Sequence, residues 1–201
     1  MGLGDVYKRQ IDDFEPTRYN VEQLEHEAPQ SVALRGFRTL VLNRTRRGGI
    51  LAEGASLNRR GENGKGVASR WYPKTITKRI RAISEHRDKI EFRETDGMSM
   101  LEQILTESSN RRITVFLDPP YTAGGKRAGR RLYNHNCIDH SHLYSMLKDS
   151  GIDFLMTYDE SSGIRDLVSR HGFHAVRVMM KNTHHDQVTE LIISQRDVFR
   201  P

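Results

Sequence analysis

Apolar and polar positions in the C-terminal half of the chain form blocks that predict strands and helices in turn. Ile113 to Leu117 is a run of five apolar or β-branched residues, which predicts a strand buried on both faces of a parallel sheet. The blocks that follow predict a helix, a strand, a second helix and the two arms of a hairpin, over Asp139–Lys148, Asp153–Tyr158, Ser162–His171, His174–Met180 and Val188–Ser194. The expected fold is α/β, with a sheet closed by an antiparallel hairpin.

The N-terminal half has helical spacing of its apolar residues at Ser31–Asn43 and Pro73–Arg87, and Met98–Glu107 also follows a helical pattern. Ile90 to Thr95 alternates between apolar and polar residues, which predicts a further strand. Asp96 falls between that strand and the next helix, where an acidic residue makes a good N-cap.

The net charge of +6 is distributed unevenly along the chain. Residues 35–93 hold sixteen Lys or Arg against five Asp or Glu, whereas residues 12–34 hold six acids and only Arg18. The basic block is rich in Gly and Asn and has little periodicity, which predicts mobile loops suited to a phosphate backbone. The candidate DNA-binding residues in it are Arg44, Arg46, Arg47, Arg59, Arg60, Lys65 and Arg70.

The strongest chemical signal is Asp118-Pro119-Pro120-Tyr121, directly after the predicted strand at 113–117. Ligands of open α/β sheets bind beyond the carboxyl ends of the strands, which is where this tetrapeptide falls. Two prolines supply carbonyls but no N–H groups. Asp118 and the Pro119 carbonyl can accept the two hydrogens of an exocyclic amine, and Tyr121 can stack on the ring that carries it.

This tetrapeptide resembles the catalytic motif of amino-methyltransferases, and Asp in its first position is typical of the DNA adenine-N6 enzymes. Further segments resemble the D12-type DNA adenine methylases in the same order, namely Arg38–Thr45 with Gly48–Ile50, Gly129–Tyr133, Asn134–Asn136, Asp153–Asp159, His171–Phe173, Met180–His185 and Glu190–Ile193. The resemblance covers roughly residues 12 to 196.

The resemblance implies a Rossmann-like methyltransferase sheet that carries a basic helical and loop insertion. It implies S-adenosylmethionine as cofactor, held by Asp96 and Asp118, and double-stranded DNA with a flipped adenine as partner. Asp118, Pro119, Pro120 and Tyr121 would be the catalytic residues. A glycine-rich flap at 122–132 would close over the base or touch DNA through Lys126 and Arg130. A cognate restriction endonuclease is a further partner that such a family allows.

The chain departs from this family at its N-terminus. The family's glycine-rich turn between a strand and a helix, which holds the methionine part of the cofactor, has no counterpart, because neither Gly2-Leu-Gly4 nor Gly48-Gly49 follows a predicted strand. We therefore expect an N-terminally truncated enzyme whose first strands are missing. The expected organisation is a non-native segment at 1–10, an acidic lead-in at 11–34, a basic DNA-recognition insertion at 35–89 and the C-terminal part of the catalytic domain at 90–201.

Two other kinds of function remain open at this stage. One is a methyltransferase acting on RNA or on another amino group, and the other is an inactive fragment that only binds nucleic acid. A metal site is not expected, because His135, Cys137, His140 and His142 lack the paired spacing of zinc ligands. The lone cysteine, together with the lack of a signal peptide or a long apolar run, predicts a cytoplasmic protein without membrane spans.

Overall fold

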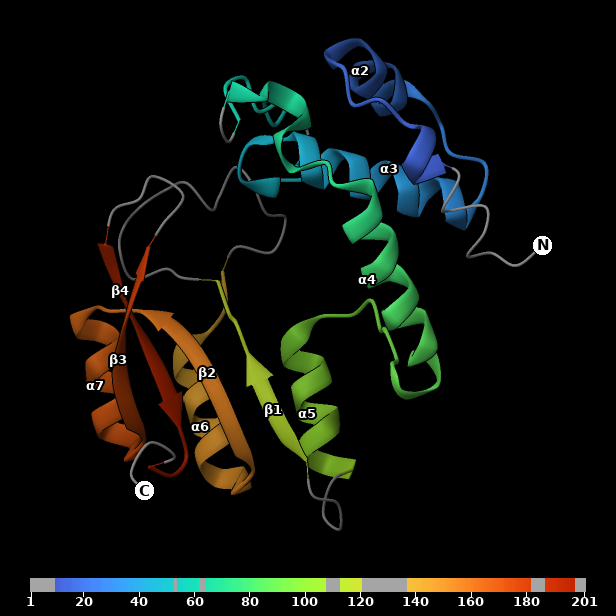
Figure 1. Cartoon of the computed structure of the whole chain (residues 1–201). Helices are drawn as coiled ribbons and strands as arrows, with labels where there is room; N and C mark the ends of the chain where they lie inside the picture. Colours follow the sequence, from blue (N-terminus) through green and yellow to red (C-terminus); the bar gives the residue numbers. More distant parts are fainter. Residues whose placement is uncertain are drawn as a thin grey trace. The chain divides into compact units, whose positions relative to one another are not determined.

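The structure is a computed structural model of the 201-residue chain, and it describes residues 10–52, 54–61, 64–107, 113–120, 137–181 and 187–197. The chain divides into two compact units, which Figure 1 shows in the colours of the sequence. Unit 1 spans Met1–Arg93 and unit 2 spans Glu94–Pro201.

Unit 2 is built on a four-stranded mixed sheet in the order β1-β2-β4-β3. The strands are β1 (Thr114–Leu117), β2 (Asp153–Asp159), β3 (His174–Lys181) and β4 (Gln187–Ser194). β1 and β2 are parallel, whereas β4 is antiparallel to both of its neighbours. The predicted α/β class and the closing antiparallel strand pair are confirmed.

The helices of unit 2 begin and end where local chemistry favours it. They are α5 (Gly97–Glu107), α6 (His140–Ser150) and α7 (Ser162–His171). The Asp139 carboxylate caps α6 by accepting from the backbone N–H of His142 at 2.9 Å. α7 ends at Gly172, whose φ of 67° suits a left-handed C-cap. All three helices confirm the sequence prediction to within two residues at each end.

The core of unit 2 lies between one face of the sheet and helices α6 and α7, which both lie behind the sheet in Figure 1. Phe154, Met156 and Tyr158 alternate along β2 and are buried, and Leu191 and Ile193 of β4 join them. Burial of one face of a strand leaves the other face for polar or half-buried side chains. That second face carries Thr157 and Asp159.

β1 differs from its prediction, because it is not buried on both faces. Among the described residues β1 pairs only with β2, so it forms an edge of the sheet. Val115 and Leu117 pack on the core, whereas the Phe116 side chain is 67% exposed. The run of apolar residues therefore does not mean burial on both faces here, because no described element covers the face that carries Phe116.

The strand predicted at Ile90–Thr95 does not form. These residues have no strand hydrogen bonds, and Phe92 is 87% exposed. They follow the short helical turn η4 (Arg87–Lys89). The backbone N–H of Ile90 donates to the Arg87 carbonyl at 3.2 Å. Alternation predicts a strand only where a neighbouring strand is available for pairing, and none meets this segment in the described structure.

Unit 1 is helical. It contains α2 (Arg18–His26), α3 (Val32–Thr45), η1 (Arg47–Gly49), η3 (Gly66–Arg70) and α4 (Pro73–Glu85). Its core joins Ile11 and Val21 to Phe37, Trp71 and Ile76. Residues from the acidic 11–34 segment and from the basic block therefore share one hydrophobic core.

The predicted mobile loops between α3 and α4 are instead a folded segment in most of their length. The backbone of Arg46 bridges that of Leu57, and Arg47 N–H donates to the Ser56 carbonyl at 2.9 Å. Gly61 has a φ of 60°, and a Cβ there would lie 2.3 Å from the Gly66 carbonyl oxygen. The lack of periodicity in this segment therefore reflects an irregular backbone that is tightly packed, as in many compact loops.

Candidate active site

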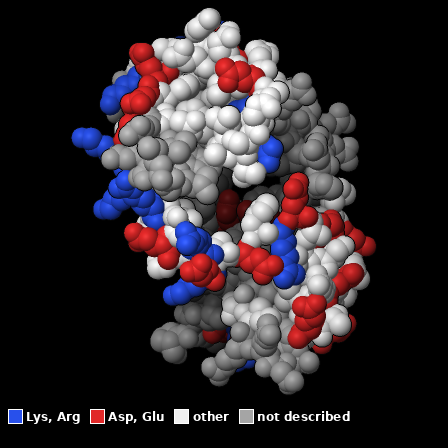
Figure 2. All heavy atoms as spheres, turned by 90° about the vertical axis from the view of Figure 1, so that its right-hand side faces the viewer, with Lys and Arg blue, Asp and Glu red and all other residues white. Residues whose placement is uncertain are grey.

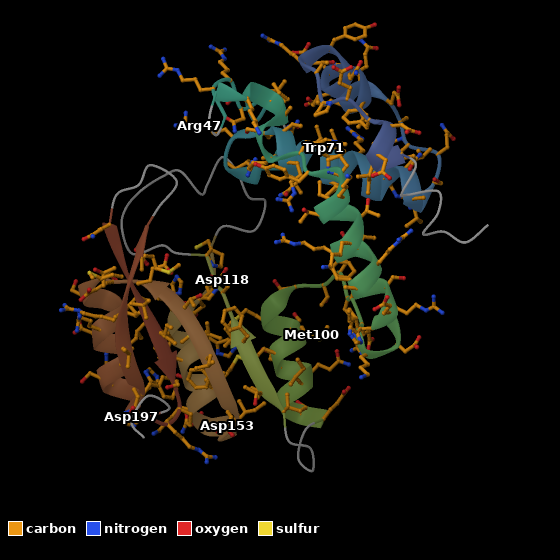
Figure 3. All side chains as sticks on the ribbon, viewed as in Figure 1. Arg47, Trp71, Met100, Asp118, Asp153 and Asp197 are labelled. Atoms are coloured by element: carbon orange, nitrogen blue, oxygen red, sulfur yellow. The ribbon has the colours of Figure 1, made fainter. Side chains whose placement is uncertain are left out.

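Asp118 lies at the carboxyl end of β1, where Figure 3 labels it. Its carboxylate is held by β2, because the Thr157 hydroxyl donates to Asp118 Oδ1 at 2.8 Å. The same hydroxyl lies 3.5 Å from the Leu117 carbonyl oxygen, so the carboxylate is its closer acceptor. Asp118 thus combines an exposed position with a fixed orientation.

The residues after Asp118 are described only in part. Pro119 and Pro120 are half-buried and continue the chain without N–H donors. Tyr121 lies outside the described residues, and so do the predicted flap residues Lys126 and Arg130. The structure therefore presents the carboxylate and the proline carbonyls, while the predicted stacking partner stays a prediction.

A second pair of polar groups lies at the carboxyl end of β2. The His140 Nδ1 atom is 2.6 Å from the hydroxyl of Tyr158, which is fully buried. Burial lowers the pKa of His140, and the nearby Asp139 and Asp159 carboxylates oppose that shift. Sequence reasoning missed Thr157, Tyr158 and His140. The signal was available, because Thr157-Tyr158-Asp159 ends the strand next to β1.

Glu160 follows β2 and joins two elements of unit 2. Its Oε1 atom accepts from Arg165 Nε of α7 at 2.8 Å and from Arg177 Nε of β3 at 2.9 Å. Hydrogen bonds from these two guanidinium groups lower the pKa of Glu160. This carboxylate is occupied in holding structure and is not free for chemistry.

Asp96 has the role of a helix cap. Its Oδ1 atom accepts from the backbone N–H of Ser99 at 3.0 Å and from the Ser99 hydroxyl at 3.2 Å, at the start of α5. This outcome favours the N-cap interpretation over a cofactor contact, since the strand that should precede Asp96 is missing.

The described residues do not build a site for S-adenosylmethionine. Such a site needs a glycine turn between a strand and a helix. Within the described parts of residues 10–107 no strand is formed, and the adjacent glycines with positive φ, Gly48 and Gly49, follow helix α3. The described residues therefore do not fit the cofactor that the resemblance implies.

Arg46 is wrong as a DNA-binding residue, because its side chain is inside unit 1. It is 2% exposed, forms an ion pair with Glu25, and donates from Nη1 to the carbonyls of Leu51 and Ala52 at 2.9 and 3.0 Å. Arg70 is half-buried and donates to the Asn43 carbonyl at 3.0 Å and to that of Arg46. Both guanidinium groups satisfy backbone oxygens of the folded segment.

The other predicted DNA-binding residues differ in exposure. Arg44 is half-buried, whereas Arg47, Arg59, Arg60 and Lys65 are exposed. Figure 3 labels Arg47, at the start of η1. We call Arg47, Arg59, Arg60 and Lys65 the exposed loop cations. They keep the accessibility that a phosphate contact requires.

Positively and negatively charged side chains are mixed on the face of the molecule that Figure 2 shows. Figure 2 shows one face on which Lys and Arg side chains are interspersed with Asp and Glu. Within the described parts of the chain, no group of three or more potential metal ligands gathers. No described helix is long and apolar enough to cross a membrane.

A scan against protein-family models finds no match to this chain, and a search of curated proteins finds none either.

Proposed function

We propose that unit 2 is the base-holding part of an S-adenosylmethionine-dependent DNA adenine-N6 methyltransferase. The observation that carries this proposal is the Asp118 carboxylate, fixed by Thr157 at the carboxyl edge of two parallel strands and followed by two prolines. Two parallel strands followed by an antiparallel pair are also what the resemblance implies for the end of the catalytic domain.

The chemistry assigned to this site concerns the target amine. The lone pair of the adenine N6 atom is delocalised into the ring, which makes the nitrogen a poor nucleophile. Asp118 and the Pro119 carbonyl accept the two amine hydrogens, which favours a more tetrahedral nitrogen with a localised lone pair. A carboxylate held by a neighbouring strand does this without reorganising during the reaction.

The target base must leave the duplex to reach this edge. Flipping it costs roughly a few kcal/mol, which stacking on an aromatic side chain offsets in part. The resemblance assigns that stacking to Tyr121. The exposed loop cations of unit 1 would bind phosphates of the duplex.

The chemistry proposed for Asp118 and Pro119 concerns the target amine only, since the described residues do not build a site for the cofactor. The test therefore uses a reconstructed enzyme in which a glycine-rich cofactor-loop segment is joined upstream of residue 11. Methyl transfer from labelled S-adenosylmethionine is measured on DNA, RNA and protein.

We expect the Asp118→Ala variant of the reconstructed enzyme to lose transfer to DNA while its DNA affinity changes by no more than a few-fold, because the carboxylate contacts the target amine and not the phosphate backbone. The matched control is Asp166→Ala, which removes an exposed carboxylate from α7 and should leave the rate unchanged. A variant that retains more than about a tenth of the parent rate would contradict the catalytic role of Asp118.

Two alternatives are separated by the same assay. Transfer to RNA or to protein, with none to DNA, would indicate an enzyme with another amino-group substrate. Binding of DNA without transfer to any substrate would indicate a nucleic-acid-binding chain.

A further inference from the structure

A hollow of about 420 Å³ lies along helix α4 in unit 1. It is lined by three cations and two acids, and the cations are Lys74, Lys78 and Arg81. Spacings of four and three residues place these cations on one face of the helix. Among the described residues none of the three forms an ion pair.

Thr77 is next to these cations in the lining of the hollow, and its hydroxyl is buried without a partner in the described structure. Thr77 lines the hollow and is 8% exposed, and its Oγ1 atom has no hydrogen-bond partner in the described structure. Two other helical threonines donate to the carbonyl four residues before them, Thr45 at 2.7 Å and Thr106 at 2.8 Å.

A ligand that accepts hydrogen bonds and carries negative charge satisfies this arrangement. The charge of a phosphate group is neutralised by the ammonium groups of Lys74 and Lys78 and the guanidinium group of Arg81. Lys74 and Arg81 are seven residues apart, so the cations extend about 10 Å along α4. A length of about 10 Å covers about three axial steps of 3.4 Å between successive phosphates of one DNA strand, so each cation can meet a separate phosphate.

We infer that the hollow on α4 binds backbone phosphates of DNA, in addition to any contact that the exposed loop cations make. The choice of DNA rests on the proposed function. Asp12 and Glu85 also line the hollow and limit its net positive charge. These two acids disfavour a compact anion of high charge. They favour a DNA strand whose phosphates are spread along the row of cations.

The test measures binding of the 201-residue chain to a duplex by fluorescence anisotropy at several salt concentrations. We expect Lys74→Gln, Lys78→Gln and Arg81→Gln together to weaken binding at least tenfold and to lower the slope of log K against log salt by about 2.7, at about 0.9 per phosphate contact. Thr77→Val keeps the shape of the side chain and removes a hydroxyl whose oxygen is buried, so it should leave binding unchanged. Asp12→Asn should strengthen it.

The matched control is Arg35→Gln, Arg79→Gln and Lys89→Gln, which removes the same charge from exposed cations that do not line the hollow. An equal loss of affinity and slope in both triple variants would overturn the inference, because net charge alone would then explain binding. An unchanged slope in the first triple variant would overturn it as well. Circular dichroism confirms that each variant is folded.

A second measurement separates DNA from free phosphate. Inorganic phosphate is titrated into the chain while the Thr77 amide resonance is followed, and the titration is repeated with duplex DNA. A shift with DNA at far lower phosphate concentration supports the inference, whereas saturation by inorganic phosphate without any response to DNA overturns it. Asp118→Ala should bind DNA as the parent chain does. Absence of methyl transfer by the reconstructed enzyme, with DNA binding that still depends on Lys74, Lys78 and Arg81, would count against the proposed function and leave this inference intact.

Discussion

The two units bury different kinds of side chain. Among the described residues, the buried polar side chains of unit 1 are Thr45, Arg46, Ser69 and Thr77, whereas unit 2 buries Ser194 and the two tyrosines Tyr144 and Tyr158. Unit 2 gains its order from strand pairing over an apolar and aromatic core. Unit 1 has a long irregular segment between α3 and α4, and that segment needs donors for its carbonyl oxygens.

Arginine meets this need because a guanidinium group carries five N–H donors in a fixed plane. Arg46 and Arg70 hold carbonyls of the irregular segment, so their charge contributes to the interior of unit 1. Part of the basic composition of unit 1 therefore has a structural cause. Only part of the charge excess at 35–93 is available for a partner.

The largest expected effect is on unit 1. Arg46→Ala leaves the half-buried Glu25 carboxylate and two carbonyl oxygens without their donor, and each such acceptor left unsatisfied costs about 1–3 kcal/mol. Trp71, the one tryptophan of the chain, is buried in the core of unit 1, so its fluorescence during urea unfolding measures this loss. The neighbouring exposed residue provides the control, and Arg47→Ala should change stability by less than about 0.5 kcal/mol. Equal effects of the two substitutions would contradict a structural role for Arg46.

The next effect should be confined to unit 2. Met156 is fully buried in the second strand of the sheet, and Met156→Ala should destabilise its unit by about 2–5 kcal/mol through the cavity it leaves. Hydrogen exchange of the amides of β2 and β4 measures this loss. If the units unfold separately, the Trp71 transition stays at the urea concentration of the parent chain. A matching shift of the Trp71 transition would show that the units unfold together.

The smallest effect depends on pH and also belongs to unit 2. Burial lowers the pKa of His140, so the folded unit binds a proton at this ring less readily than the unfolded chain does. The stability that the neutral ring contributes is complete above the unfolded pKa of about 6.5 and is lost as the pH falls through that value towards the lowered folded pKa. Urea unfolding of unit 2 at pH 7.5 and 5.5, compared with His140→Gln, isolates this contribution from the other histidines. A pH dependence that survives in the variant would assign it elsewhere.

Much of unit 2 could be predicted from sequence, because its elements have strong local signals. Helix α6 has its Asp139 cap, α7 has its terminal Gly172, and β2 has a period-two apolar pattern. The position of Asp118 at a strand end followed from the same signals. The bond from Thr157 could not be predicted in the same way, since it depends on the register that pairs Leu117 with Met156 across distant parts of the chain.

The failures have a common physical origin. The alternation at 90–95, the exposed face of β1 and the burial of Arg46 are all decided by what another segment supplies. A strand requires a neighbouring strand, an apolar side chain requires a covering element, and a buried guanidinium requires carboxylate and carbonyl acceptors. None of these partners is encoded in the residue itself or in its immediate neighbours.

The contact between Glu25 and Arg46 has a consequence for how the sequence can change over generations. The two residues are twenty-one positions apart, and the Glu25 carboxylate neutralises the charge of the buried Arg46 guanidinium. Loss of either leaves an uncompensated group, and lysine at position 46 cannot reach the same set of acceptors with a planar fork. Substitutions at these positions should therefore arise together, so that in related sequences an apolar residue at one is accompanied by a neutral residue at the other, while the exposed loop cations vary independently.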